Sequence, residues 1–296
     1  MSDKQPNITI PIDLTNPGQF FACCGLLELA DRLWPGAEGW FAANVFLLST
    51  GEENCSVLAL CEAVIECAFS TLLPVDELDL LTQLNQKKAE LKKASKSLAK
   101  SDESRRKSLN SKRIASGFRL GPPFELRVDW WLIERCDADH LKTWAGQQAV
   151  AGVAESIKDT LVVAAEGDIF DVEKVIVRED DGKAVAPLSF DSGRVGTAQD
   201  IGYSPDKVGQ AIACCVWTEF LTLIALQRFA VTPDDNDSFA YHIWRVPLEV
   251  SVAALAARGA FPNMVTAECT FRLAARDSGN RYKAFQQATL THWRST

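Results

Sequence analysis

Residues 8–33, ITIPIDLTNPGQFFACCGLLELADRL, begin with alternating apolar and polar side chains and continue into an almost wholly apolar run. The alternation over residues 8–14 predicts a half-buried strand. Asn16 can cap a helix, and Pro17 suits its first position, where no backbone N–H is needed. The helix predicted over residues 17–33 is apolar around a wide arc, so we expect it to be buried on more than one side.

The rest of the chain shows both patterns in an irregular order. Helices are predicted over residues 57–72, 141–160 and 206–229. Strands are predicted over residues 40–48, 124–130, 171–178, 241–252 and 265–275. Because helices and strands do not alternate regularly, we expect an α+β fold with a mixed, largely antiparallel sheet, buried helices and a projecting basic helical arm.

The composition is that of an ordinary soluble protein. The chain has 296 residues, of which 47% are hydrophobic and 24% charged, which is enough for one large domain or two smaller ones. No charged start followed by an apolar run is present, and charges interrupt the apolar stretches, so we expect a cytoplasmic protein. The expected parts are an N-terminal α/β part (residues 1–82), a basic helical arm (83–119) and a C-terminal α+β part (120–296). The first and last parts can also form one domain.

The nine cysteines do not form a recognisable framework. Cys23–Cys24 and Cys214–Cys215 are adjacent pairs inside apolar, helix-like patterns. No C-x-x-C occurs, and no Cys/His pair has zinc-finger spacing. We therefore expect reduced, mostly buried thiols and neither a metal nor another cofactor.

The most concentrated charge lies in residues 83–119, QLNQKKAELKKASKSLAKSDESRRKSLNSKRIASGFR. This stretch carries twelve basic and three acidic side chains, a net charge of +9, whereas the whole chain carries 31 basic and 39 acidic residues, a net charge of −8. The candidate nucleic-acid-binding residues are its cations: Lys87, Lys88, Lys92, Lys93, Lys96, Lys100, Arg105, Arg106, Lys107, Lys112, Arg113 and Arg119.

An acidic body that carries one basic stretch favours a polyanionic partner, most often nucleic acid. The alternative is a solvated surface insertion. Leu84, Leu91 and Leu98 recur every seven residues, which is too narrow a stripe to pack against more than one neighbour. We expect a projecting helical hairpin, or a partly disordered arm that orders when a partner neutralises its charge.

Evidence for catalysis is weak. The three histidines, His140, His242 and His292, have no metal-ligand neighbour at helical spacing, and no P-loop, G-x-S-x-G or H-E-x-x-H motif occurs. Residues 187–205 predict a long glycine-rich loop, a kind of segment that is often functional or mobile. Its acidic residues are interpreted as turn and helix caps, with Asp191 as an alternative cation ligand.

Two further features are compatible with nucleic acid. Arg194 and Gln199 lie in the glycine-rich loop, and both side chains can bond bases or backbone. Trp130 and Trp131 could stack on bases, but the alternating pattern favours burial of Trp130 and places Trp131 on the other face, at a subunit contact.

Five segments together resemble a known family. They are residues 8–41 (ITIPIDLTNPGQFFACCGLLELADRLWPGAEGWF), 126–132 (LRVDWWL), 141–148 (LKTWAGQQ), 188–206 (LSFDSGRVGTAQDIGYSPD) and 223–229 (LIALQRF). The chain resembles the small CRISPR-associated proteins of type I-U (I-G) systems that are taken as the large subunit of the Cascade effector complex. The resemblance spans about residues 8–229, with a weaker match in the tail.

The resemblance implies a non-catalytic protein of antiviral defence. Such a subunit contacts the other Cascade subunits and the guide RNA, binds double-stranded DNA at the protospacer-adjacent motif and presents the complex to a helicase-nuclease. Base pairing with the guide reads the long target sequence. Polar residues inside the shared segments are second-tier candidates for contact: Lys142, Gln147, Gln148, Arg194 and Gln199.

Two alternatives remain at this stage. The chain can be a scaffold subunit whose arm contacts only RNA or neighbouring subunits. Less expected is a nuclease that uses His140 or His242 with nearby acids.

Overall fold

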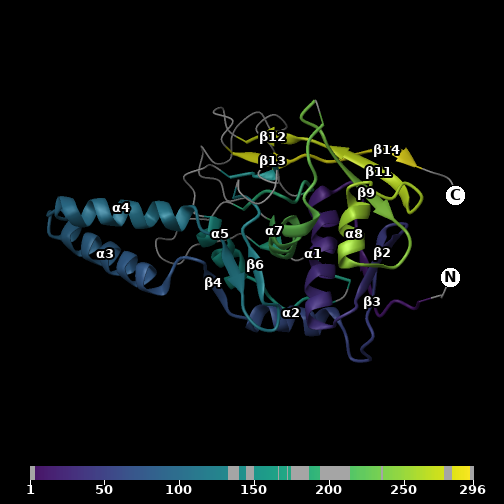
Figure 1. Cartoon of the computed structure of the whole chain (residues 1–296), viewed down its shortest axis with the longest axis horizontal. Helices are drawn as coiled ribbons and strands as arrows, with labels where there is room; N and C mark the ends of the chain where they lie inside the picture. The colour runs from purple at the N-terminus through teal and green to yellow at the C-terminus, as the bar shows by residue number, and fades with distance from the viewer. Residues whose placement is uncertain are drawn as a thin grey trace.

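The computed structural model describes residues 4–132, 140–144, 150–165, 167–171, 173–174, 187–193, 214–234, 236–276 and 282–293. The fold is α+β, and every strand pair in these residues is antiparallel. A rounded body contains most of the elements, and one helical hairpin projects from it (Figure 1).

Two buried helices, α1 (Pro17–Leu33) and α7 (Val216–Phe229), pack against each other inside the body. The Asn16 side chain accepts a 3.3 Å hydrogen bond from the backbone N–H of Gln19, so the predicted cap of α1 is confirmed. The helices approach closely, because a Cβ atom added to Gly25 would lie 2.2 Å from the carbonyl oxygen of Leu221. No side chain larger than hydrogen fits there.

One four-stranded sheet has the order β1-β3-β2-β10. Its strands are β1 (Ile8–Pro11), β3 (Val45–Ser49), β2 (Glu38–Ala42) and β10 (Leu248–Glu249). The single strand predicted over residues 40–48 is wrong. The chain reverses at Ala43, whose φ is +50°, so the apolar run forms a β-hairpin in which Trp40 pairs with Leu47.

A second sheet has the order β14-β11-β9, with β9 (Phe239–Trp244), β11 (Val265–Phe271) and β14 (Thr289–Trp293). The ribbon of β12 (Leu273–Ala275) and β13 (Lys283–Phe285) lies between β11 and β14 in the chain. The Phe20 ring on α1 stacks on Tyr241 of β9 with 4.2 Å between ring centroids. The strand prediction over residues 241–252 is wrong in extent, because β9 ends at Trp244, β10 belongs to the first sheet, and α8 (Val250–Ala257) begins directly after β10.

The third sheet, β4-β5-β6, carries the projecting hairpin. It contains β4 (Phe69–Thr71), β5 (Phe118–Leu120) and β6 (Leu126–Val128). The preceding helix α2 (Val57–Glu66) is shorter than the helix predicted over residues 57–72. The predicted helix was too long because Phe69–Thr71 pair with β5, and that pairing requires extended backbone.

The elements next to the undescribed stretches also differ from prediction. Helix α5 (Val150–Asp159) is the only α-helical part of the described residues between 141 and 160. Cys214–Cys215 form the short strand β8, paired with β7 (Glu173–Lys174), so this cysteine pair is not helical. The described cysteines are free, and all but Cys55 are buried.

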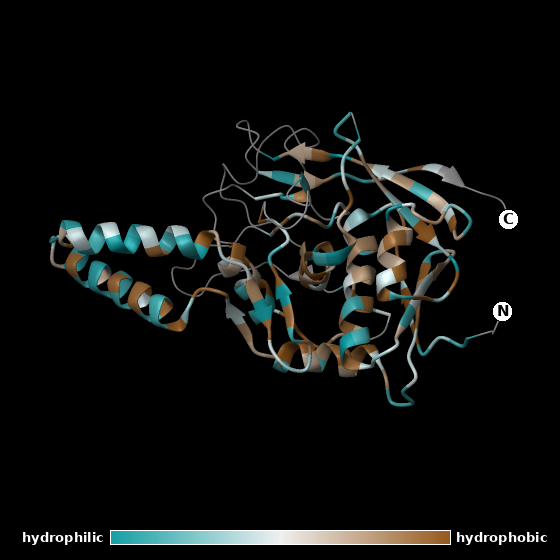
Figure 2. Cartoon of the chain, in the orientation of Figure 1, coloured by the Kyte–Doolittle hydropathy of each residue, from teal (hydrophilic) through white to brown (hydrophobic). Residues whose placement is uncertain are grey.

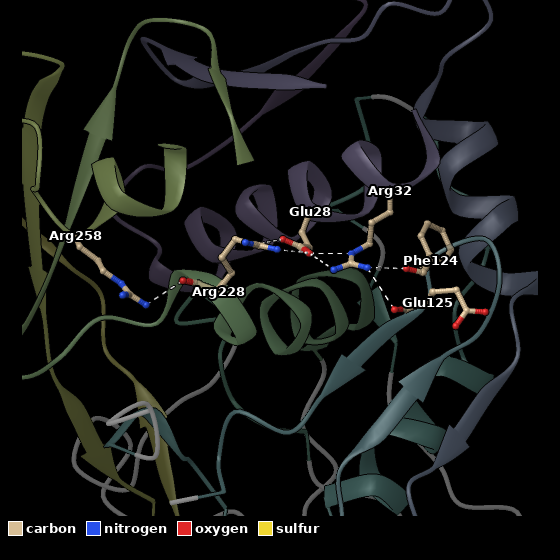
Figure 3. A network of polar contacts seen from close by, with 6 residues as sticks. All are labelled: Glu28, Arg32, Phe124, Glu125, Arg228 and Arg258. Atoms are coloured by element: carbon tan, nitrogen blue, oxygen red, sulfur yellow. Dashed lines mark hydrogen bonds and ion pairs between the residues drawn. The ribbon is translucent and has the colours of Figure 1, made fainter. Parts of the chain in front are cut away.

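A polar network connects the central helices to the third sheet (Figure 3). The buried Glu28 on α1 pairs with Arg32 at 2.8 Å and with Arg228 of α7 at 2.6 Å. Arg32 also donates to the carbonyl oxygens of Phe124 and Glu125, just before β6. The turn between β5 and β6 is thereby attached to the core of the body.

The hairpin is mainly hydrophilic, whereas brown apolar segments are common among the helices of the body (Figure 2). Within the described residues, every helix is too short or too polar to cross a lipid bilayer.

Candidate nucleic-acid interface

The projecting arm is a helical hairpin inserted between two adjacent strands. Helix α3 (Val75–Lys93) follows β4, and α4 (Lys100–Ile114) leads back to β5. The backbone N–H of Leu72 donates a 2.9 Å hydrogen bond to the carbonyl oxygen of Gly117, which closes the base of the arm. The arm therefore leaves the body through a paired β-ribbon. Its first helix begins before Gln83, the expected boundary of the basic stretch.

Local sequence explains the two helices. Asp76 and Glu77 lie in the first turn of α3 and Lys92 and Lys93 in its last turn, which complements the helix dipole. The turn then follows a Schellman arrangement: Ser95 has a φ of +54°, and the N–H groups of Ser95 and Lys96 donate to the carbonyl oxygens of Lys92 and Leu91. The arm has its own small apolar cluster, formed by Leu81, Leu84 and Leu109 with Leu80 packed against it.

The structure divides the twelve candidate cations into two groups. The first group forms ion pairs with carboxylates. The pairs are Lys87–Asp102 (2.7 Å), Lys88–Glu103 (3.1 Å), Arg106–Glu103 (2.8 Å), Lys112–Glu77, Arg113–Glu155 (3.3 Å) and Arg119–Glu125. Hydrogen bonds from Arg106 and Lys88 lower the pKa of Glu103 to about 2. The Arg113–Glu155 pair also connects the arm to α5.

The second group makes no ion pair within the described parts of the chain. Its members are Lys92, Lys93, Lys96, Lys100, Arg105 and Lys107, and all six are exposed. Four of them lie in residues 92–100, at the far end of the hairpin, where the sequence has no acidic residue. Positive charge without a carboxylate partner is thus gathered at the point of the arm farthest from the body.

Sequence reasoning did not identify the acidic residues that limit this charge. Residues 75–82 add Asp76, Glu77 and Asp79, so residues 75–119 carry twelve basic and six acidic side chains, or +6. The sequence indicates one of these ion pairs, because Glu103 and Arg106 are three residues apart on one helix. The ion pairs between α3 and α4 depend on how the two helices are aligned. The spacing of residues along the chain does not specify that alignment.

The second-tier candidates are distributed differently. Lys142 lies with its Nζ atom 5.7 Å from the centroid of the Trp144 ring. Gln147, Gln148, Arg194 and Gln199 fall outside the described residues.

The two adjacent tryptophans do not provide a stacking surface. Trp130 is 0% exposed and Trp131 is 5% exposed, so the expectation that Trp131 lies on an outer face is wrong. Both rings pack edge-on against Trp144, with 5.6 and 5.7 Å between ring centroids. The alternating pattern fails here because the chain turns at residues 130–131, directly after β6.

Asp191, the alternative cation ligand, lies close to a second acidic residue, Glu219. Asp191 is buried; its Oδ1 accepts hydrogen bonds from Asn16 at 2.7 Å and from the N–H of Gly193 at 3.1 Å, the turn-capping arrangement. Burial raises the pKa of the nearby Glu219 to about 8. Glu219 Oε1 accepts from the N–H groups of Phe190 and Asp191, so the two acids hold residues 190–193 against α1 and α7.

The described contacts of His242 are with other groups. His242 lies between the carbonyl oxygen of Ala257 (3.2 Å) and Glu268 (3.3 Å). His140 is exposed, and the side chain of His292 is outside the described residues. No group of three metal-ligating side chains with suitable geometry occurs among the residues that the structure describes.

A comparison of the chain with protein-family models, with curated proteins and with solved structures found no match in any of the three. The class of protein is therefore defined by the chain itself: an α+β body with a charged helical hairpin inserted in a β-ribbon.

Proposed function

We propose that this chain is a non-catalytic subunit of a CRISPR type I-U (I-G) Cascade effector complex. In this role it binds target double-stranded DNA near the protospacer-adjacent motif, contacts the guide RNA and supports R-loop formation in antiviral defence. It acts in the cytoplasm beside the other Cascade subunits and the helicase-nuclease that the complex recruits. The sequence resemblance supports the choice of complex, and the geometry of the arm supports a polyanionic partner.

The observation that carries the proposal is the group of six exposed cations on the arm that have no carboxylate partner among the described residues. Lysine and arginine side chains neutralise phosphates and release the counterions condensed on nucleic acid. A cation that already pairs with a carboxylate contributes less positive potential, so we assign binding to the second group and arm structure to the first.

The charge of the body supports the same arrangement. Outside residues 75–119 the chain carries 19 basic and 33 acidic residues, or −14. A body with this charge repels phosphates, whereas the arm attracts them at a distance from most of those acids. The combination limits indiscriminate coating of DNA and orients the molecule with the arm toward the duplex.

The test compares two triple variants in the reconstituted effector complex. Lys92→Gln/Lys93→Gln/Lys96→Gln removes three unpaired charges at the tip of the hairpin. Lys87→Gln/Lys88→Gln/Lys112→Gln removes three paired charges from the same arm and is the matched control. We expect the tip variant to weaken duplex binding roughly ten-fold at about 100 mM salt and to lower the log–log salt slope by about one per lost phosphate contact, with a smaller loss in the control.

Duplex affinity is measured over a salt series, and assembly of the complex is followed by size-exclusion chromatography. Equal losses in the two variants would show that only net charge matters and would contradict the assignment to the tip. Unchanged binding in both variants would remove the arm from DNA recognition. If the tip variant fails to assemble, the arm contacts RNA or neighbouring subunits, which is the scaffold alternative.

A further inference from the structure

Helix α4 separates its side chains between two faces. The face toward α3 and the body contains Asp102, Glu103, Arg106, Leu109 and Arg113, all buried or half-buried. The opposite face is exposed along the helix and contains only cations and serines. Its residues are Lys100, Ser101, Ser104, Arg105, Lys107, Ser108, Ser111 and Lys112.

This outer face has no acidic side chain. Both acids of α4, Asp102 and Glu103, point to the inner side, where they pair with Lys87, Lys88 and Arg106. By contrast, three of the four cations of the outer face, Lys100, Arg105 and Lys107, make no ion pair with any described residue. The fourth, Lys112, pairs with Glu77 of α3. The inner ion pairs thus remove negative charge from the surface that faces away from α3.

The spacing on the outer face fits a run of phosphates. Lys100 and Lys107 are two turns apart on one side of the helix, a rise of about 10 Å. Along one strand of a DNA duplex this distance corresponds to the axial rise of roughly three phosphates. The serines between the cations are short, so a backbone can approach closely, and their hydroxyl groups can donate to phosphate oxygens.

The arm has no means of stacking on bases. Residues 75–117 contain no phenylalanine, tyrosine or tryptophan. Proteins that hold single strands usually combine a positive groove with aromatic platforms, and the arm has only the charge. The chemistry therefore favours the sugar–phosphate backbone of a duplex over unpaired bases.

From these observations we infer that the outer face of α4 is a track for the phosphate backbone of duplex DNA. The track contributes affinity without sequence preference, so selection of the protospacer-adjacent motif takes place outside the arm. This inference rests on the proposed function, because it assumes that the arm binds DNA, and it goes further by assigning the ligand chemistry and the helix face.

The experiment uses the full chain in the reconstituted complex with three duplexes. One duplex has a permissive flanking motif, one has a non-permissive motif, and one is unrelated to the guide. The track variant is Lys100→Gln/Arg105→Gln/Lys107→Gln, and the matched control is again Lys87→Gln/Lys88→Gln/Lys112→Gln. We expect the track variant to lose affinity roughly ten-fold for all three duplexes, with the preference between motifs retained and the salt slope lower by about three.

A second variant tests the track without removing a cation. Ser104→Glu/Ser108→Glu introduces two carboxylates on the outer face and should weaken binding of all three duplexes, whereas Ser104→Ala/Ser108→Ala should have a much smaller effect. Circular dichroism of each purified chain checks that the helices are retained.

The outcomes separate the inference from the proposed function. A loss confined to the permissive duplex would mean that α4 reads bases, and the track would be wrong. Normal binding by the track variant, with weak binding by the tip variant Lys92→Gln/Lys93→Gln/Lys96→Gln, would overturn the track and leave the DNA-binding arm in place. Normal binding by both variants would overturn both ideas.

Discussion

Two buried glutamates show how the environment decides the role of one residue type. Glu28 forms ion pairs with Arg32 and Arg228, and these contacts connect α1 to α7 and to the turn before β6. The Oε1 atom of Glu219 instead accepts hydrogen bonds from two backbone N–H groups, those of Phe190 and Asp191. Burial raises the pKa of Glu219 more than these two hydrogen bonds lower it, and the pKa is about 8.

The raised pKa of Glu219 makes stability depend on pH. Below the unfolded-state value of 4.5 both states are protonated, and between 4.5 and about 8 only the folded state keeps the proton. The free energy of unfolding should therefore fall by about 1 kcal/mol per pH unit as pH rises through this window. Glu219→Gln should flatten that slope in urea denaturation between pH 5 and about 8, since the amide stays neutral in both states.

Glu28→Gln is the comparison for this prediction. It removes the negative charge that pairs with two arginines and replaces one acceptor oxygen by an NH2 group, and we expect it to cost roughly 2–3 kcal/mol at neutral pH. If Glu219→Gln keeps the wild-type slope, the folded-state carboxyl does not hold a proton in this range.

At the scale of elements, the contact between α1 and α7 is the centre of the body. The helices touch through backbone at Gly25, and the Thr222 hydroxyl donates a 2.8 Å hydrogen bond to the carbonyl oxygen of Gly18. The arm is attached in a different way, through strand pairing of β4 with β5 and the ion pair Arg113–Glu155.

Gly25→Ala tests the close contact of the helices. Alanine favours a helix over glycine by about 1 kcal/mol, but its Cβ would lie 2.2 Å from the Leu221 carbonyl oxygen. The clash should outweigh the propensity and lower the free energy of unfolding by roughly 2–3 kcal/mol in chemical denaturation.

Gly51→Ala provides a matched control, because nothing lies within 4 Å of the added Cβ atom. We expect a change within roughly 0.5 kcal/mol there. Equal effects at the two positions would show that the α1–α7 contact tolerates a wider separation.

For the whole molecule, the distribution of charge is the main physical feature. The arm carries +6 and the remainder −14, and four of the six cations that make no ion pair with a described residue lie at the end of the arm farthest from the body (Figure 1). Such a molecule should approach a polyanion with the arm first.

Photo-crosslinking can check this orientation. A photoreactive residue in place of Lys96, at the tip, should crosslink to duplex DNA in the assembled complex. The same residue in place of Glu62, which is exposed on α2, should give several-fold less product. Raising salt from about 50 to 200 mM should reduce the Lys96 product steeply, because the attraction depends on counterion release. Equal yields at the two positions would contradict an arm-first approach.

Local patterns predicted several elements well. The cap at Asn16, the extent of α1 and the strands within residues 265–275 are confirmed because short-range patterns determine them. The predictions over residues 40–48 and 57–72 are wrong in extent. In both stretches an apolar run continues through a change of structure. The change in residues 40–48 is a hairpin turn at Ala43, and the change in residues 57–72 is decided by pairing of β4 with the distant strand β5.

The sequence by itself determined the charge of the arm, its helical character and the absence of aromatic side chains from residues 75–117, because these follow from composition and local pattern. Only the tertiary structure decided which cations remain without a partner. Lys87 meets Asp102 and Lys112 meets Glu77 because α3 and α4 fold against each other, and α5 brings Glu155 to Arg113. Ion pairing depends on distance in space, and separation along the chain does not specify that distance.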